Sequence, residues 1–589
     1  MFTSLLSFAL CAFGQTQAPK ARSNSTGRES ALKKEGLADI QKGDLPAARK
    51  AFESLVRLNP RDAEAHNSLG WVLLSQGEVK PAIAELQTAI RLKPALPDAR
   101  INLSAALVQN RDAEGAVREA RTAVNLAPQT AEAYKALGHA LEFSRDIAGA
   151  TMALRRAVEL DPSRFDAQDD LGSLLATQND LPAAMAQFQE AIRLKPNFAP
   201  PHLHLGVACY EEKNFEKAAA ELERFLQLNP QSPLGFFYLG LARRERGDVN
   251  SAIAALEESV RLAPDQANAQ NELGLLLQRA GRPADAAAAF KEVIRVQPVN
   301  PDPENNLGLS LLEAGDGDGA IAAFQSALRL RPDDTGYRGN LGAAYLQKAD
   351  FAAAVAEFQA ALRRDPNDQS LHYNLGLALK LQDKLPEAIR EFRKAEELDP
   401  AQPDAHYTLG VTLWQQGDFS AAVPELRAAT RAKPDYAEAY YTLGTVLKQE
   451  GELEQSADAL KEAIRLEPDF AGAHTTLAAV LRQLGDAEGA AAESRAGAEL
   501  EKQKTSEQAA LFRTNSGHRL LNAGDIEGAI SQFRLAISSV PNYAMAHFQL
   551  GLALWQQGKF EEAQEEFQKA ATLDPRLTPP ASTKKSPNS

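Results

Sequence analysis

Small and large apolar residues follow one fixed pattern along most of the chain, and this pattern repeats every 34 residues. Most repeats have a Leu-Gly pair at the seventh and eighth positions, an Ala at the twentieth and a large apolar residue at the twenty-fourth. Apolar residues four apart lie on one face of a helix. A turn such as Gly417-Asp418 separates the two halves of a repeat. The pattern therefore predicts two short helices, A and B, in every repeat.

Prolines close thirteen successive repeats, and each lies 34 residues after the one before. They are Pro60, Pro94, Pro128, Pro162, Pro196, Pro230, Pro264, Pro298, Pro332, Pro366, Pro400, Pro434 and Pro468. A 34-residue period with a Leu-Gly pair, a later Ala and a closing Pro resembles the tetratricopeptide repeat family. This resemblance implies an all-α fold, an α–α superhelix (solenoid) of helix–turn–helix repeats with a concave face.

The register of the repeats divides the chain. Fourteen contiguous repeats occupy residues 29–504, an insertion occupies 505–509, and two further repeats occupy 510–577. Residues 15–28 are expected to form a flexible lead-in and residues 578–589 a disordered tail. No stretch outside the repeats is long enough for a separate catalytic domain.

Residues 1–14 have the length and apolar centre of a secretory signal peptide, and they are too short to span a bilayer. The first four residues carry no Lys or Arg, so a false signal or a misplaced start is the alternative. With a genuine signal the chain is exported, periplasmic or secreted; without one it is cytoplasmic.

The fourteenth repeat departs from the pattern at several positions. Ala478 replaces the Leu-Gly glycine, Ser494 replaces the large apolar residue, and Lys502 replaces the closing proline. Gly497 stands where helix B usually has Ala, which lowers helix propensity by about 1 kcal/mol. We expect one long helix through the insertion and a weak junction that lets the last two repeats move as a unit.

The small residues at positions eight and twenty are expected where helices A and B touch. Large residues at position twenty-four are expected to fill the gap to the next repeat, as with Phe188, Phe290, Phe358 and Phe567. Asp or Asn follows the A–B turn in many repeats, where its side chain can cap helix B. Carboxylates elsewhere are interpreted as residues of helix starts and solvated faces.

Composition limits the partners. The net charge is -14 and no large cationic block exists, which argues against nucleic acid. The two cysteines, Cys11 and Cys209, leave the folded body without an internal disulfide, and Cys209 is expected in the core.

No residue pattern indicates catalysis, a metal or a cofactor. Six of the nine histidines share position four, where the family usually has a Trp or Tyr, and they are interpreted as ring-shaped packing residues: His66, His202, His372, His406, His474 and His547. Gly315-Asp-Gly-Asp-Gly319 is interpreted as the turn of the ninth repeat, because neither the phosphate-loop nor the calcium-loop pattern fits.

Helix A also presents positions two, six, nine and thirteen away from helix B, and the family resemblance places this face in the concave groove. Position six has Asn306, Asn340 and Asn374 in consecutive repeats, similar to the asparagine ladder of O-linked N-acetylglucosamine transferases. Position five has Tyr373, Tyr407 and Tyr441. These six residues are the candidate peptide-binding residues. The alternative is that they are common at these positions and only pack.

Three functions remain open. The first is a non-enzymatic protein-protein interaction scaffold that grips extended peptide segments. The second is the repeat subunit of a glycosyltransferase, or of an envelope or secretion assembly complex, with catalysis on another chain. The third is self-association of the superhelix. We predict protein or peptide partners, no nucleic acid, no direct membrane span and no cofactor.

Overall fold

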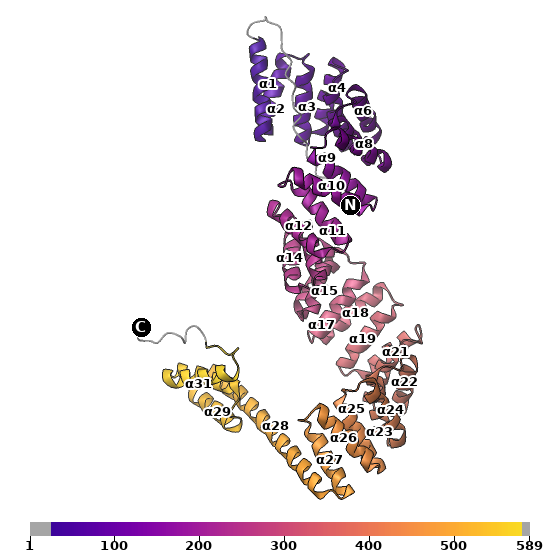
Figure 1. Ribbon diagram of the computed structural model, residues 1–589, viewed down its shortest axis with the longest axis vertical. Coiled ribbons are helices and arrows are strands. Elements are labelled where there is room, and N and C mark those ends of the chain that lie inside the picture. Colours follow the sequence, from indigo (N-terminus) through magenta and orange to yellow (C-terminus); the bar gives the residue numbers. More distant parts are fainter. Residues whose placement is uncertain (1–24, 580–589) are drawn as a thin grey trace. The chain divides into compact units, whose positions relative to one another are not determined.

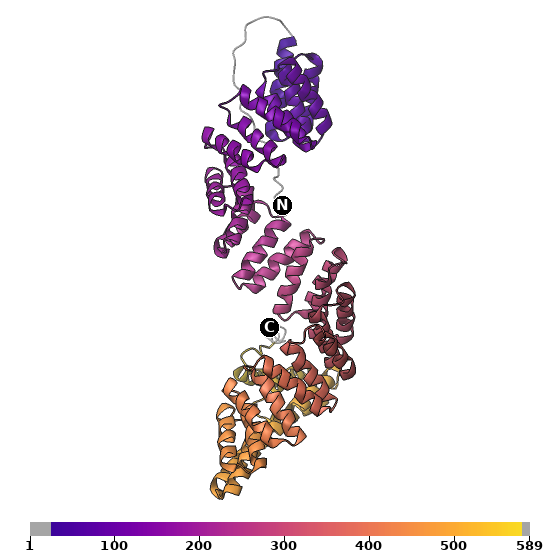
Figure 2. The same cartoon turned by 90° about the vertical axis from the view of Figure 1, so that its right-hand side faces the viewer.

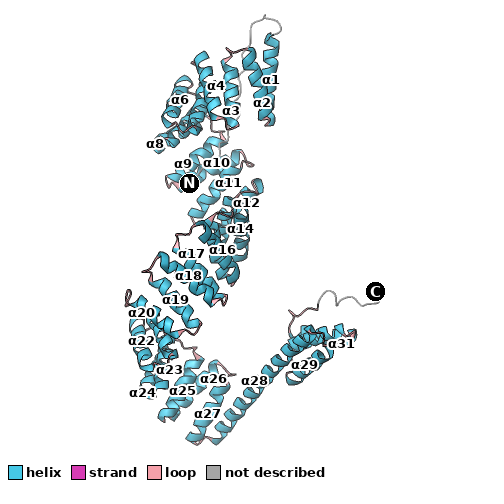
Figure 3. Cartoon of the chain, turned by 180° about the vertical axis from the view of Figure 1, so that it is seen from behind, coloured by secondary structure: helices cyan, strands magenta, loops and turns pink. Residues whose placement is uncertain are grey.

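A computed structural model describes residues 25–579, so the predicted signal peptide, most of the lead-in and residues 580–589 lie outside the described residues. The described residues form 31 helices and no strand (Figure 3). The predicted all-α repeat fold is confirmed. No helix among residues 25–579 has the length and apolar content needed to cross a bilayer.

Contacts divide the chain into two compact blocks, one ending at Ala314 and the other beginning at Gly315. The helices of the first block are α1 Ser25–Lys42, α2 Leu45–Leu58, α3 Ala63–Ser75, α4 Val79–Leu92, α5 Pro97–Gln109, α6 Ala113–Leu126, α7 Ala131–Phe143, α8 Ile147–Leu160, α9 Phe165–Thr177, α10 Leu181–Leu194, α11 Ala199–Glu211, α12 Phe215–Leu228, α13 Pro233–Glu245, α14 Val249–Leu262, α15 Ala267–Arg279, α16 Pro283–Val296 and α17 Pro301–Glu313.

The helices of the second block are α18 Gly317–Leu330, α19 Thr335–Gln347, α20 Phe351–Leu362, α21 Gln369–Leu381, α22 Leu385–Leu398, α23 Pro403–Gln416, α24 Phe419–Ala432, α25 Ala437–Glu450, α26 Leu453–Leu466, α27 Ala471–Leu484, α28 Ala487–Asn522, α29 Ile526–Ser539, α30 Ala544–Gln556 and α31 Phe560–Leu573. Within each block, helix A of a repeat packs on its own helix B, and helix B packs on the next helix A (Figures 1 and 2).

The turn between helices A and B places its second residue in the left-handed region. Glycine fills this position in ten repeats, for example Gly417 with φ 90°. The next residue caps helix B: the Asp418 carboxylate accepts from the Ala421 N–H at 3.1 Å. Equivalent caps at Asp44, Asp112, Asp146, Asp180, Asn214, Asp316, Asp350, Asp486 and Asp525 confirm the sequence prediction. Asp248 is an exception, because it makes no such bond.

The eighth-position glycine leaves room for the twenty-fourth residue of the same repeat. A Cβ at Gly172 would lie 2.6 Å from the Phe188 ring, and one at Gly70 would lie 2.5 Å from Leu86. Position twenty-four therefore packs within its own repeat as well as in the predicted gap to the next repeat. Phe188 does both, since its ring also lies 5.3 Å from the His204 ring of the next repeat.

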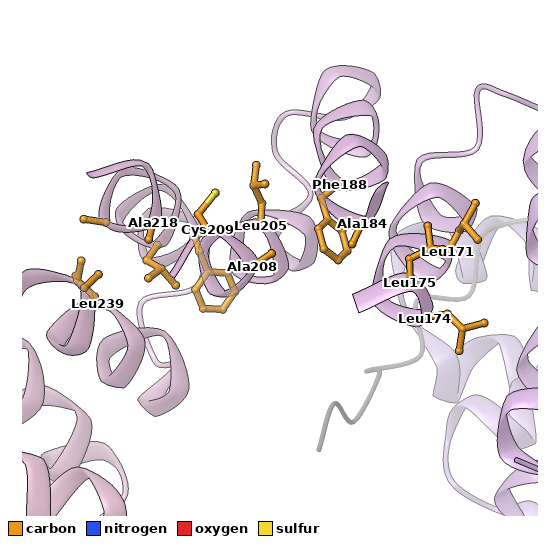
Figure 4. Packing of buried hydrophobic residues seen from close by; sticks show 14 of the residues in the cluster. Leu171, Leu174, Leu175, Ala184, Phe188, Leu205, Ala208, Cys209, Ala218 and Leu239 are labelled. Carbon is orange, nitrogen blue, oxygen red and sulfur yellow. The ribbon is translucent and has the colours of Figure 1, made fainter. Parts of the chain in front are cut away.

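The core is a chain of such contacts rather than one centre. One cluster runs from Leu171 and Leu175 through Phe188 and Leu205 to Leu239 (Figure 4). Cys209 is 1% exposed within it, as predicted.

A single helix, α28, covers the segment 505–509, where the sequence predicts a long helix; it serves as helix B of the fourteenth repeat and helix A of the fifteenth (Figure 1). In place of the missing large residue at Ser494, a cavity of about 660 Å³ lies beside α27 and the first half of α28.

Candidate functional site: the inner face of the A helices

Successive A helices lie close enough to contact one another directly. Examples are α3 with α5, α5 with α7 and α11 with α13 in the first block, and α23 with α25 in the second. Successive B helices of the described residues are not in comparable contact. The A helices therefore line the inner side of the local curve, which is where the family resemblance places the candidate binding face.

The predicted asparagines are all partly buried. Asn306 lies on α17 in the first block, whereas Asn340 on α19 and Asn374 on α21 belong to the second. The backbone carbonyl of Asn306 accepts from Gln278 at 3.3 Å. Asn102, at the same position of an earlier repeat, donates to Asn67 at 2.9 Å, so an amide of this row can be engaged by its neighbour.

The three predicted tyrosines pack between or within repeats. Tyr373 lies 5.8 Å from the Phe392 ring, and its hydroxyl lies 3.1 Å from that of Thr408. Tyr407 lies 5.0 Å from the Tyr436 ring, and Tyr441 lies 4.7 Å from the Phe470 ring. All three remain partly exposed. The packing gives them a structural role, and their role in binding stays a prediction.

A network of charged side chains connects α7, α9 and α11 on this face, and the sequence interpretation missed it. Its members, here called the A-face network, are Lys135, His139, Asp166, Asp169, Asp170 and His204. Lys135 pairs with Asp166, His139 with Asp170 at 2.8 Å, and His204 with Asp169 at 2.8 Å.

The network is deeply buried at one end and more open at the other. Lys135, Asp166 and Asp169 are 5–6% exposed, whereas the His139 side chain is 33% exposed. Burial of such charges costs free energy unless they are paired. The interpretation of carboxylates as residues of helix starts and solvated faces therefore fails for Asp169, and Asp166, at a helix start, is buried rather than solvated.

The pKa shifts follow from burial and pairing. Burial raises the pKa of the Asp169 carboxyl, against the hydrogen bond from His204. Burial also opposes the charge of Asp170, but His139 and Lys135 prevail and lower its pKa. The pKa of His139 is raised because Asp170 outweighs its burial.

Position two of four consecutive A helices carries a carboxylate, which we call the acidic row: Glu64, Asp98, Glu132 and Asp166. Lys33 pairs with Glu64 at 2.6 Å, and Arg164 pairs with both Glu132 and Asp166. Asp98 has no ion-pair partner among the described side chains, and its pKa is raised by burial and by Glu132. Acidic residues are common at helix starts because they interact favourably with the helix dipole. A carboxylate at the same position of four consecutive repeats is the signal by which the sequence could have revealed the acidic row.

Five of the six position-four histidines are buried and His372 is partly buried, but they are not simple ring fillers, and this corrects the sequence interpretation. His406 Nδ1 lies 2.9 Å from a Glu425 oxygen, and Nε2 lies 3.0 Å from the Pro400 carbonyl. The same two kinds of partner, a helix-B glutamate and the closing proline of the preceding repeat, contact His66, His202, His372, His474 and His547.

Both acceptors lack a proton, so only the imidazolium form makes both bonds. Burial opposes this charge, but the bonds to Glu425 and the Pro400 carbonyl raise the pKa of His406 above its ordinary value. Position four also holds Arg100 and Arg338, which donate to Glu119 and Glu357 and to the same proline carbonyls. A cation at position four with a Glu at position twenty-three is thus a recurrent clamp across the repeat junction. In the sequence it is visible because the two residue types occur together in the same repeats.

One such clamp brings together three potential metal ligands. His406, Glu425 and Glu396 lie within 4.8 Å of one another through one ligand atom each. His406 Nδ1 faces both carboxylates, at 2.9 and 3.6 Å, and an imidazolium between two carboxylates accounts for this arrangement.

Cys209 is buried, and its Sγ lies 3.8 Å from Met185 Sδ. Burial raises the pKa of its thiol, which disfavours the nucleophilic thiolate.

Tetratricopeptide family models match residues 33–97, 407–469, 441–514 and 514–577, and another tetratricopeptide model matches 378–417. The model of the cilia and flagella-associated protein 70 C-terminal domain matches residues 163–377. A comparison with curated protein sequences finds no match.

Among solved structures, the chain is similar to the Cut9–Hcn1 complex of the APC/C (16% identity, 77% of this chain and 96% of that one, TM-score 0.34). It is also similar to MamA from Desulfovibrio magneticus (26%, 29% and 97%, TM-score 0.28) and to YrrB, a tetratricopeptide protein with an unusual peptide-binding site (26%, 32% and 96%, TM-score 0.29). The family models and the 34-residue period, together with the paired helices, identify this chain as a member of the tetratricopeptide repeat family.

Proposed function

We propose that this chain is a non-enzymatic scaffold that binds an extended segment of a partner protein along the inner face of its A helices. Repeats of this family support protein interaction and are generally non-catalytic. The observation that carries the finer proposal is the concentration of charge on α3 to α11, where carboxylates are held on consecutive A helices.

The charges favour a partner segment that contains Lys or Arg. Six carboxylates lie in this group, and the cations near them are Lys93, Lys135 and Arg164, together with His139 and His204. The carboxylates are Asp98, Glu132, Glu142, Asp166, Asp169 and Asp170. Asp98 and Glu142 have no ion-pair partner among the described residues. A carboxylate whose pKa is raised gains most from a new cation, and Asp98 is such a group.

An extended segment suits the spacing of the face, because each A helix offers side chains at the same register positions as its neighbour. In the second block, Asn340, Asn374 and the three tyrosines offer amides and phenol rings at such positions, and Asn306 does so in the first. We propose that these residues contact the same kind of segment through its backbone and its apolar side chains.

The test uses the full chain and an array of extended synthetic peptides of basic, acidic and neutral composition. We expect basic peptides to bind most strongly, with affinity that falls as ionic strength rises. The double variant Asp98→Asn, Glu142→Gln should weaken this binding roughly tenfold, which is about 1.4 kcal/mol.

A matched control is Glu114→Gln, which removes an exposed carboxylate from helix α6 on the B side. It should leave binding unchanged. An equal loss of binding free energy per removed charge in the double variant and the control would show that the binding is non-specific attraction to an acidic protein, and would contradict the proposal.

A further inference from the structure

Each regular junction between repeats is closed by one recurring contact. The twenty-seventh residue of a repeat, on helix B, packs on the third residue of the next helix A. Four small clusters contain such pairs: Ala89 with Ala99, Ala123 with Ala133, Ala157 with Ala167, and Ala536 with Ala546.

The two residues of this contact differ in size from junction to junction. At one junction Phe225 occupies position twenty-seven, and the third residue of the next helix is Gly235. A Cβ at Gly235 would lie 2.6 Å from the Phe225 ring. Glycine accommodates the large residue at this junction, whereas the buried Tyr337 and Leu371 lie opposite Ala327 and Ala361 at theirs.

Repeats fourteen and fifteen have a glycine and a large residue at these two positions, but the contact is absent. A Cβ at Gly497 would lie 2.8 Å from Thr475 Oγ1, on helix α27 of the same repeat. Position twenty-seven is Gly497, and the third residue of the next repeat is Phe512. Both lie on the single helix α28, so they are about 22 Å apart at the helical rise of 1.5 Å per residue. Phe512 is 67% exposed and its neighbour Leu511 is 50% exposed. The residues equivalent to Phe512 are buried in the other repeats that follow a regular junction, as with Ala133 and Tyr337.

The other half of the junction is an open slot. The cavity of about 660 Å³ is lined by residues of α27 and α28: Arg482, Ala487, Ala490, Ala491, Ser494, Arg495 and Ala498. In the preceding repeat the equivalent positions include Leu453, Ala457, Leu460 and Ile464, which pack with the following helix α27. The slot therefore lies where a regular array would place the next A helix.

We propose that a second copy of this chain fills the slot, with two α28 helices side by side and antiparallel. The register of a regular junction places Phe512 of each copy on Gly497 of the other. The same register places Ser494 opposite the Asn515 amide of the partner copy. One two-fold axis satisfies both contacts at once, as in an isologous dimer.

The structure favours a second copy over a fold-back of the same chain. A fold-back must break α28 near residues 499–509, which contain neither Gly nor Pro and are helical throughout. Most of these residues are exposed, and an isolated helical segment of this length is marginal in water. A partner helix stabilises this segment in its helical conformation. Each open junction face then makes the same kind of contact that helix B and the next helix A make at the regular junctions.

The mass of the full chain in solution, measured by light scattering, is the first test. We expect twice the chain mass for the natural protein and a monomer for Phe512→Asp. The matched control Met152→Asp alters a similarly exposed residue, 69% exposed, on helix α8 and should stay dimeric. Circular dichroism verifies that both variants remain helical. A natural chain that is monomeric over the accessible concentration range overturns the proposal.

Disulfide trapping tests the register. In a background with Cys11→Ser and Cys209→Ala, the single variants Ser494→Cys and Asn515→Cys are mixed under oxidising conditions. Within one continuous α28 these positions are about 32 Å apart and cannot form a bond. We expect a covalent dimer from the mixture and little from either variant alone. An intrachain bond in the double variant, at monomer mass, would instead show a fold-back and contradict the proposal.

Discussion

The eighth residue of a repeat is limited in size by the side chain that lies over it. At Gly376 an added Cβ would lie 2.5 Å from the Phe392 ring, whereas at Gly472, also helical, the nearest atoms are 3.4 Å away. We expect Gly376→Ala to destabilise the chain by about 1–3 kcal/mol through overpacking. Gly472→Ala should be neutral or stabilising by up to about 1 kcal/mol, because Ala has the higher helix propensity. Denaturant unfolding of the two variants checks this, and equal effects would show that Phe392 can move aside.

The position-four clamp predicts which substitutions His406 tolerates. His406→Arg should keep the free energy of unfolding, because Arg100 and Arg338 make the equivalent bonds. His406→Gln should lose on the order of 1–2 kcal/mol, since a neutral amide cannot make a charge-assisted bond to Glu425. Thermal unfolding of both variants measures the difference; a stable Gln variant and an unstable Arg variant would refute the clamp.

The same clamp predicts a pH dependence with a definite sign. The folded-state pKa values of His202 and His406 are raised, so the protonated form is the stabilising one. Their contribution is complete below the ordinary value of about 6.5 and is lost as pH rises through the raised values. The Tm of the natural chain should therefore fall between about pH 6 and pH 8. A double variant with Arg at both positions should fall less, and an equal fall would assign the effect to other groups.

Residue roles were predictable only where geometry leaves little choice. Small residues such as Gly172 and the capping Asp418 follow from the helix pair itself. The histidine bonds and the charged pair Lys135–Asp166 depend on residues 19 and 31 positions away, which only the folded helix pairs bring together. Asn374 and Tyr441 are partly buried, which suits both packing and binding, so their role in binding stays a prediction.

At the scale of elements, the helices follow from the period, because each 34-residue unit contains its own caps, turn and packing residues. α28 is longer than the other helices because Lys502 replaces the closing proline. In the other repeats that proline is followed by a turn that ends helix B. The division of contacts between Ala314 and Gly315 falls inside the ninth repeat and has no counterpart in the repeat pattern.

The junction within α28 predicts uneven protection from hydrogen exchange. In an array, each repeat is stabilised by its neighbours, and repeats fifteen and sixteen lack the contact with repeat fourteen. In the Phe512→Asp variant, α29, α30 and α31 should exchange faster than α21 to α26. Hydrogen exchange with mass spectrometry resolves these segments, and one uniform transition would show that the helix alone couples them.

At the scale of the whole molecule, the chain combines a net charge of -14 with carboxylates concentrated on the inner face of consecutive A helices. Within each block the repeats supply a surface of constant register, and we propose that the residues that differ along it provide selectivity. In this account the partner segment is recognised by its extended backbone and its basic side chains.

The most direct test of this account maps where such a segment binds. A basic peptide from the array, carrying a photoreactive group, is cross-linked to the full chain, and the modified residues are found by mass spectrometry. The account predicts cross-links on the A helices α5, α7, α9 and α11, reduced in the Asp98→Asn, Glu142→Gln variant. Cross-links mainly on the B helices α6, α8 and α10, or unchanged in that variant, would contradict it.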